Sequence, residues 1–278
     1  MPLAFAVSCL APLALLPAAA FALARPGQRP GSLPRWSEAS ALAAFALGLA
    51  GLVQAALGPL ATIGVLNGAA QLALRADLVS TAMATLVGFI GWIVMRYSRT
   101  YLDGEAREGT FHALMLTALA AVLVFVQAGT LATMILAAII VGIALKRLLL
   151  FYPDRPEAQR AATKFAAVWH AGDAMLILAA ALLFAAFGTI EFAALADAAR
   201  TTAPGLAGTL GIAAIVAAAA LKTAAFPLHG WLTEVMEAPT PVSALLHAGI
   251  INSGGVLLIT AAPLVQTSTG AMAALVLI

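Results

Sequence analysis

Five ionisable side chains lie within or beside one long apolar stretch in the last third of the chain. They are Lys222, His229, Glu234, Glu237 and His247. A charge at the centre of a bilayer costs about 2.5–3.5 kcal/mol, so such residues usually face a protein interior or water and mark ion or proton pathways. We therefore interpret this stretch as a candidate proton or ion path.

Lys222 is the deepest of these residues, and Pro227 follows it within the same apolar segment. Proline removes a backbone donor and clashes with the preceding turn, so we expect the helix to break at Pro227. Broken helices at membrane depth line water-filled cavities or lie buried in protein. Removal from water disfavours the charged form of lysine, which would allow Lys222 to exchange a proton. The alternative is a lysine that snorkels from a helix end.

Two further groups extend this path. His247 lies among apolar residues of the next segment and titrates near neutral pH, so it is a candidate proton carrier or a hydrogen-bonded core histidine. Glu234 and Glu237 are three residues apart and share a helical face. We place Glu237 near the cytoplasmic mouth of the path, or on a solvated helix end, and regard Glu234 and His229 as accessory.

Asp173 is the only acidic residue inside the first six predicted spans. It is therefore our candidate counter-ion for Lys222, and His170 lies one helical turn away on the same face. The predicted relay consists of Lys222, His247, Asp173 and Glu237. His112 begins the fourth predicted span, where we expect an interfacial position.

These residues belong to an all-α polytopic membrane protein. The 278 residues are 63% hydrophobic and 9% charged, with a mean hydropathy of +1.03. A transmembrane helix needs about 20 mostly apolar residues, and the sequence contains eight such segments before a partial ninth that begins near 270. The predicted spans are 3–24, 39–58, 79–97, 111–127, 130–150, 165–188, 206–226 and 241–262.

The distribution of basic residues predicts the orientation. The loops after the first, third and fifth spans hold eleven of the fourteen lysines and arginines, whereas the alternate loops hold only Arg75 and Arg200. Basic loops stay in the cytoplasm, so we expect a multi-pass protein of a bacterial inner membrane with its N-terminus outside. The arginines follow the first apolar run, which favours a span over a cleaved leader.

Little else in the sequence points to chemistry. The net charge of +2 gives no indication of nucleic-acid binding, and the single cysteine, Cys9, cannot form an internal disulfide. We find no metal-ligand cluster, nucleotide loop or nucleophile motif. We therefore expect a transport subunit without a catalytic site, metal or cofactor of its own. The outer segment 59–78 is too polar for a span and would form a short hairpin or a surface helix.

Three segments resemble the antiporter-like membrane subunits of respiratory complex I, Mrp sodium/proton antiporters and DAB inorganic-carbon transporters. The strongest likeness is FPLHGWLTEVMEAPTPVSALLHAGIINSGG (226–255), and weaker ones cover 74–102 and 161–176. The resemblance implies that Lys222 is the central relay lysine and that His247 lies on the same hydrophilic path. It also implies one five-helix repeat over about spans four to eight, with a broken seventh helix. We divide the chain into 1–110, the proton-channel repeat 111–262, and 263–278.

The chain departs from this family in two respects. Complex I and Mrp subunits carry a glutamate in the fifth span, whereas GTLATMILAAIIVGIAL (129–145) contains no acid and Ile139 falls about where the glutamate is expected. The family also has two inverted repeats, and this sequence ends after the first, as a half-length member or a fragment would.

Two segments are most similar to the DAB membrane subunit. They are EVMEAPTPVSALLHAGIIN and, in a cytoplasmic loop, KRLLLFYPDRPEAQ. That resemblance implies a large cytoplasmic partner resembling a zinc β-carbonic anhydrase, with zinc in the partner. The membrane subunit would conduct protons or sodium ions to drive CO2 hydration in one direction. The alternatives are a proton-translocating subunit of a complex I-like quinone oxidoreductase, an Mrp-type antiporter subunit, and a passive anchor.

Overall fold

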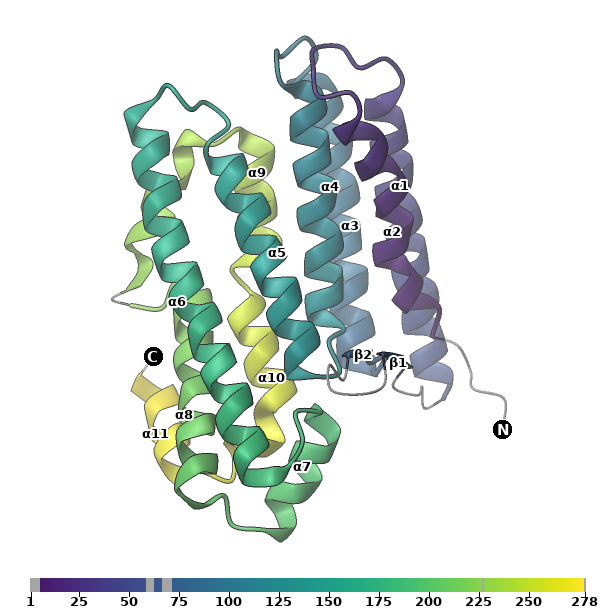
Figure 1. The fold of residues 1–278 in the computed structure, drawn as a ribbon. Helices are drawn as coiled ribbons and strands as arrows, with labels where there is room; N and C mark the ends of the chain where they lie inside the picture. Colours follow the sequence, from purple (N-terminus) through teal and green to yellow (C-terminus); the bar gives the residue numbers. More distant parts are fainter. Residues whose placement is uncertain (1–5, 59–62, 67–71, 227, 278) are drawn as a thin grey trace.

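The computed structural model describes residues 6–58, 63–66, 72–226 and 228–277, which form a helical bundle with one small hairpin (Figure 1). The helices in the first half are η1 (Val7–Leu10), α1 (Ala11–Leu23), α2 (Leu33–Leu57), α3 (Leu78–Tyr101), α4 (Glu108–Val126) and α5 (Leu131–Leu149). The second half contains α6 (Pro156–Phe187), α7 (Phe192–Thr201), α8 (Gly205–Lys222), η2 (Leu228–Glu237), α9 (Thr240–Leu245), η3 (Leu246–Ile250), α10 (Ser253–Val265) and α11 (Thr269–Leu277).

The predicted all-α membrane architecture is confirmed. Among the described residues, six helices are long and apolar enough to cross a membrane, namely α2, α3, α4, α5, α6 and α8. Two shorter apolar helices are Val7–Leu23, which matches the first predicted span, and Ser253–Val265, which overlaps the second half of the last one. The count of eight complete spans stays a prediction, as does the role of α11 as a partial ninth.

The connections of the bundle separate into two ends. The loops α1–α2, α3–α4 and α5–α6 lie together at one end, and the hairpin and α7 lie at the other (Figure 1). We call these the arginine-rich end and the hairpin end. Strand β1 (Ile63–Leu66) pairs antiparallel with β2 (Leu72–Leu74). The hairpin expected within 59–78 is thus present in the described part of that segment.

Helix α4 forms the centre of the core. Almost all of its residues are buried, and it packs against α1, α3, α5 and α10. Its first turn is covered by the loop after α1, since the Gly109 amide donates to the Gly27 carbonyl at 3.1 Å. A Cβ at Gly109 would overlap the Arg25 carbonyl. Only glycine therefore allows the loop to lie against the start of α4.

Two helices of the second half are interrupted. Helix α8 ends at Lys222, and Ala224 has a positive φ of 52°, a conformation that costs a non-glycine residue about 1–2 kcal/mol. The expected break at Pro227 lies outside the described residues, and the observed end of the helix comes before it. The last predicted span consists of α9, the π-helical turn η3 and α10. Single π-turns occur frequently at functional sites.

Candidate ion-translocation site

A buried ion pair joins α6 to the end of α8. The Lys222 side chain is 0% exposed, and its Nζ donates to Asp173 Oδ1 at 2.7 Å. The Asp173 side chain is 6% exposed. Desolvation of such a pair costs several kcal/mol per ion, and only good geometry and further polar contacts offset that cost. The structure therefore contains a charged pair that packing alone would not require.

An aromatic ring also faces the Lys222 ammonium, and Lys222 itself ends its helix. Its Nζ lies 4.0 Å from the centroid of the Trp169 ring, within the range of a cation–π interaction. Lys222 is also the last residue of α8, where free carbonyl groups favour a cation. These contacts stabilise the protonated amine without a second carboxylate.

Local sequence explains why the pair fits. A Cβ at Gly172 would lie 3.2 Å from Lys222 Cγ, so the glycine allows the lysine stem to lie close against α6. The Trp169 indole Nε1 donates to the Ala138 carbonyl of α5 at 2.9 Å. Trp169 is thus fixed between α5 on one side and Lys222 on the other.

The second oxygen of Asp173 contacts a more accessible group. Asp173 Oδ2 lies 3.2 Å from His170 Nδ1, and the His170 side chain is 48% exposed. His170 was expected only to share a helical face with Asp173. The structure instead forms a continuous chain from a half-exposed imidazole through a buried carboxylate to a fully buried amine.

His247 lies apart from this chain. It is an exposed residue of η3, and no contact in the described part of the structure joins it to Lys222. A cavity of about 10 Å³ is lined by Trp169, Gly249 and Ser253 and by apolar side chains of α4, α5 and η3, and neither Lys222 nor His247 is among its lining residues. That volume is near the lower limit for one water molecule. The Ser253 hydroxyl is buried beside it without a partner among the described residues.

The other predicted site residues lie on the segment after α8. The backbones of Glu234 and Glu237 belong to η2, but their side chains fall outside the described residues. His229 is exposed, and its ring stacks on Phe226 with centroids 5.5 Å apart. Their predicted roles at the mouth of the path therefore stay predictions.

His112 is buried in the bundle. Its side chain is 0% exposed, and neither ring nitrogen has a partner in the described part of the structure. Its expected depth at the membrane interface stays a prediction.

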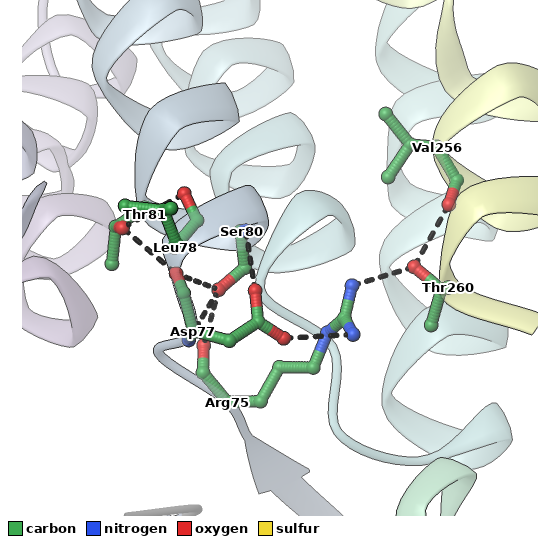
Figure 2. A network of polar contacts seen from close by, with 7 residues as sticks. All are labelled: Arg75, Asp77, Leu78, Ser80, Thr81, Val256 and Thr260. Atoms are coloured by element: carbon green, nitrogen blue, oxygen red, sulfur yellow. Dashed lines mark hydrogen bonds and ion pairs between the residues drawn. The ribbon is translucent and has the colours of Figure 1, made fainter. Parts of the chain in front are cut away.

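A second polar cluster at the hairpin end was not predicted from the sequence. Figure 2 shows Arg75, whose Nη1 lies 3.0 Å from Asp77 Oδ2 and whose Nη2 donates to Thr260 Oγ1 at 2.6 Å. Asp77 also caps α3, because its Oδ1 accepts from the Ser80 amide at 2.7 Å. Burial lowers the pKa of the Arg75 guanidinium from its ordinary value, and the Asp77 charge opposes that shift. The D-x-x-S capping box was visible in the sequence, but the contact with Thr260 was not.

This cluster borders a cavity of about 210 Å³ between the start of α3, α7 and α10. Arg75, Asp77 and Glu191 supply its charged lining, and Thr260 lies on its α10 side. Arg75 therefore links the loop before α3 to the helix that follows η3. In the described residues, no group of three or more histidine, cysteine, aspartate or glutamate side chains could hold a metal ion.

The chain matches two family models. Residues 128–278 match the transmembrane family of NADH:quinone oxidoreductases and Mrp antiporters, and residues 64–112 match the N-terminal region of complex I chain 5. The fold is similar to a chain of the archaeal membrane-bound sulfane sulfur reductase (MBS), with a TM-score of 0.85 and 18% identity over 98% of this chain and 56% of that one. It is also similar to a chain of the Mrp complex from Dietzia sp. DQ12-45-1b, with a TM-score of 0.75 and 26% identity over 89% of this chain and 27% of that one.

Curated relatives give the same grouping. The chain is 38% identical to the probable inorganic carbon transporter subunit DabB2 of Halothiobacillus neapolitanus over 76% of its own length and 38% of that protein. It is 32% identical to NADH-quinone oxidoreductase subunit L of Escherichia coli over 81% of its length and 40% of that protein. The chain thus spans about two fifths of the length of these relatives. It belongs to the NADH:quinone oxidoreductase/Mrp antiporter family of membrane subunits.

Proposed function

We propose that this chain is the ion-conducting membrane subunit of a complex that accumulates inorganic carbon. The observation that carries the proposal is the buried Lys222–Asp173 pair, extended by His170 to the exposed surface of α6. The similarity to inorganic carbon transporter subunits supports the choice of substrate. The conducted ion is a proton or a sodium ion, and the ionisable chain favours a proton.

The proposed step is an exchange of counter-charge. In the resting pair, the Asp173 carboxylate balances the Lys222 ammonium at 2.7 Å. A proton that reaches Asp173 through His170 neutralises the carboxylate and leaves the ammonium without its counter-ion. The buried amine then releases its proton, because an uncompensated charge in this environment is costly.

The released proton would leave toward η3. Ser253 and a single water in the adjacent cavity would lead from the Trp169 side to His247. Glu237 and Glu234, with His229 as an accessory, would line the mouth on η2. In the closing step the Asp173 proton passes to the neutral Lys222 amine at 2.7 Å, which restores the ion pair and completes the transfer of one proton.

The proposed partner is a large cytoplasmic zinc subunit resembling a β-carbonic anhydrase. It would dock on the arginine-rich end near 96–110 and 146–164, which the positive-inside rule assigns to the cytoplasm of a bacterial inner membrane. The N-terminus would then lie outside. Conduction through this chain would supply the energy for vectorial CO2 hydration in the partner.

Two other functions are weaker candidates. A complex I-like or Mrp-type subunit would need the fifth-span glutamate, whereas α5 carries no acidic residue and Ile139 occupies the expected region. A passive anchor would have no use for a buried Lys222–Asp173 pair, since a well-packed apolar pair is often as stable.

Gradient-dependent carbon uptake in cells tests the proposal. Lys222→Gln removes the exchangeable proton but leaves the buried Asp173 carboxylate without the ammonium that balances its charge, so the Lys222→Gln/Asp173→Asn double variant serves as the assembly-competent form. We expect both variants to lose uptake and growth at ambient CO2, while the double variant still co-purifies with the zinc partner. Full uptake by an assembled double variant would make the chain an anchor. Co-purification with flavin or iron–sulfur subunits would instead favour the complex I-like alternative.

A further inference from the structure

We propose that the groove between α1 and α2 binds an anionic glycerophospholipid. One acyl chain lies along the groove, and the phosphate lies at Arg25 and Arg35 at the arginine-rich end. This site is separate from the Lys222 pair and does not depend on the proposed function.

The groove results from small side chains on two neighbouring helices. Its volume is about 570 Å³, and its α1 side repeats at helical spacing through Ala14, Pro17, Ala18 and Phe21. The α2 side has the same repeat, made of Trp36, Ala39, Ser40 and Ala43. The alanines leave the space between the helices unfilled, and the two aromatic rings stand at the end near the arginines.

The lining of the groove suits a hydrocarbon chain. The groove follows about two turns of α1, or about 10 Å at 1.5 Å per residue. Its walls are alanine, proline and aromatic side chains, with Ser40 as the polar exception, so an acyl chain can lie along it without leaving a buried polar group unpaired.

Charge selects an anionic headgroup. The Arg25 guanidinium lies 4.6 Å from the centroid of the Phe21 ring, which lines the groove. Arg35 directly precedes Trp36 of the groove and lines a separate polar cavity of about 340 Å³ with Arg29, Arg99, Asp103 and Glu108. In the described part of the chain, Arg25 and Arg35 form no ion pair, whereas Arg29 pairs with Asp103 and Arg99 pairs with Glu38, so the acids of both pairs are already neutralised. Basic sites between membrane helices on the cytoplasmic side commonly bind anionic headgroups.

Trp36 fits the same assignment. Its side chain is exposed by 62%, and it belongs to the first turns of α2, directly after Arg35. Tryptophan is enriched at the level of lipid headgroups because one edge is polar and the ring is apolar. An aromatic ring and two arginines therefore define the headgroup level, and the alanines below it define the chain path.

Native mass spectrometry of the purified complex tests this site. The complex is equilibrated in nanodiscs of phosphatidylglycerol or phosphatidylcholine, and the lipid retained after detergent transfer is counted. We expect selective retention of phosphatidylglycerol that falls several-fold in Arg25→Gln/Arg35→Gln. Ala43→Phe, which fills the groove and keeps both charges, should reduce retention similarly.

Matched controls separate this site from general surface charge and from misfolding. Arg96→Gln removes the charge of an exposed arginine on α3 near the arginine-rich end. Ala56→Phe enlarges an exposed residue of α2 that does not line the groove. Both should retain phosphatidylglycerol as the unmodified complex does. An equal loss in Arg96→Gln would overturn the proposal, as would equal retention of phosphatidylcholine.

Two further outcomes would also count against it. Soluble glycerol phosphate should not displace the lipid, because it lacks the acyl chain, and displacement would reject the groove as the chain site. A photocrosslinker at Ala39 should label lipid. Labelling of a polypeptide in the intact complex would show that a protein segment occupies the groove.

Discussion

The indole of Trp169 occupies the space that Gly142 leaves on α5. A Cβ at position 142 would lie 2.5 Å from Trp169 Cδ1 and 2.8 Å from its Nε1. The same indole donates to Ala138 and faces Lys222 Nζ. Gly142 and the Ala138 carbonyl of α5 thus together set the position of the ring that contacts the buried ammonium.

Gly142→Ala should therefore disturb the ion pair without changing any charge. Overpacking costs typically about 1–3 kcal/mol, and the displaced indole would weaken its contact with Lys222. We expect a lower melting temperature of the purified complex and reduced uptake, both restored in part by Trp169→Phe in the same chain. The control is Gly255→Ala, because a Cβ at that position has open space. Gly188→Ala is unsuitable as a control because Gly188 has a positive φ, which strains any other residue.

The contacts of Asp173 predict an order of effects. Asp173→Asn removes the counter-charge of Lys222 and the acceptor of His170, so uptake should fall strongly. His170→Gln retains a polar side chain next to Asp173 but cannot carry a proton, so uptake should fall while the complex remains stable. Uptake in right-side-out vesicles with an imposed gradient measures both. Normal uptake by His170→Gln at matched protein levels would show that the histidine is not on the path and that water delivers the proton to Asp173.

Sequence reasoning identified the partners of the ion pair but not its surroundings. Asp173 could be selected because it was the only acid in the first six predicted spans. The Trp169–Gly142 contact could not, because it depends on how closely α5 and α6 approach. The break at Pro227 lies outside the described residues and stays a prediction, and the end of α8 at Lys222 and the positive φ of Ala224 depend on local backbone geometry.

His112 and His247 show a second limit of the sequence. No feature of the sequence signalled that the His112 side chain is fully buried, because its burial depends on how the helices pack around α4. His247 sits among apolar neighbours in sequence, yet it is exposed on the π-helical turn η3. Hydrophobic periodicity assumes a regular helix and fails where the helix widens.

The membrane orientation of the chain can be tested at the two ends of the bundle. Reporter fusions at Gly104 and Glu157 should give cytoplasmic signals, and a fusion at Ala194 on α7 should give an external one. The reason is that basic loops remain on the cytoplasmic side. Gly104 belongs to the α3–α4 loop and Glu157 to the start of α6, and these connections lie at the end opposite α7 (Figure 1). An external signal at Glu157 together with a cytoplasmic one at Ala194 would invert the topology.

Arg75 should stabilise the hairpin end. Arg75→Gln removes the contacts with Asp77 and Thr260 (Figure 2), and hydrogen bonds to charged groups are each worth about 1.5–3 kcal/mol. We expect a lower melting temperature and faster proteolysis near the start of α3. The control is Arg200→Gln, because Arg200 pairs with Asp197 at 3.7 Å in an exposed position, where an ion pair contributes little. Equal melting temperatures for the two variants would show that the Arg75 contacts add no stability.

Ser253 tests whether the small cavity is part of the path. Its hydroxyl is buried without a described partner beside a void of about 10 Å³, next to Trp169 and Gly249. Ser253→Ala keeps the volume nearly unchanged and removes the polar atom that would hold a water there. We expect slower proton transfer, seen as reduced uptake with a larger solvent deuterium isotope effect, while the melting temperature stays the same or rises. Ser253→Thr retains the hydroxyl and should keep part of the activity if its methyl group fits. A Ser253→Ala variant with unchanged rate and isotope effect would show that protons leave Lys222 by another route.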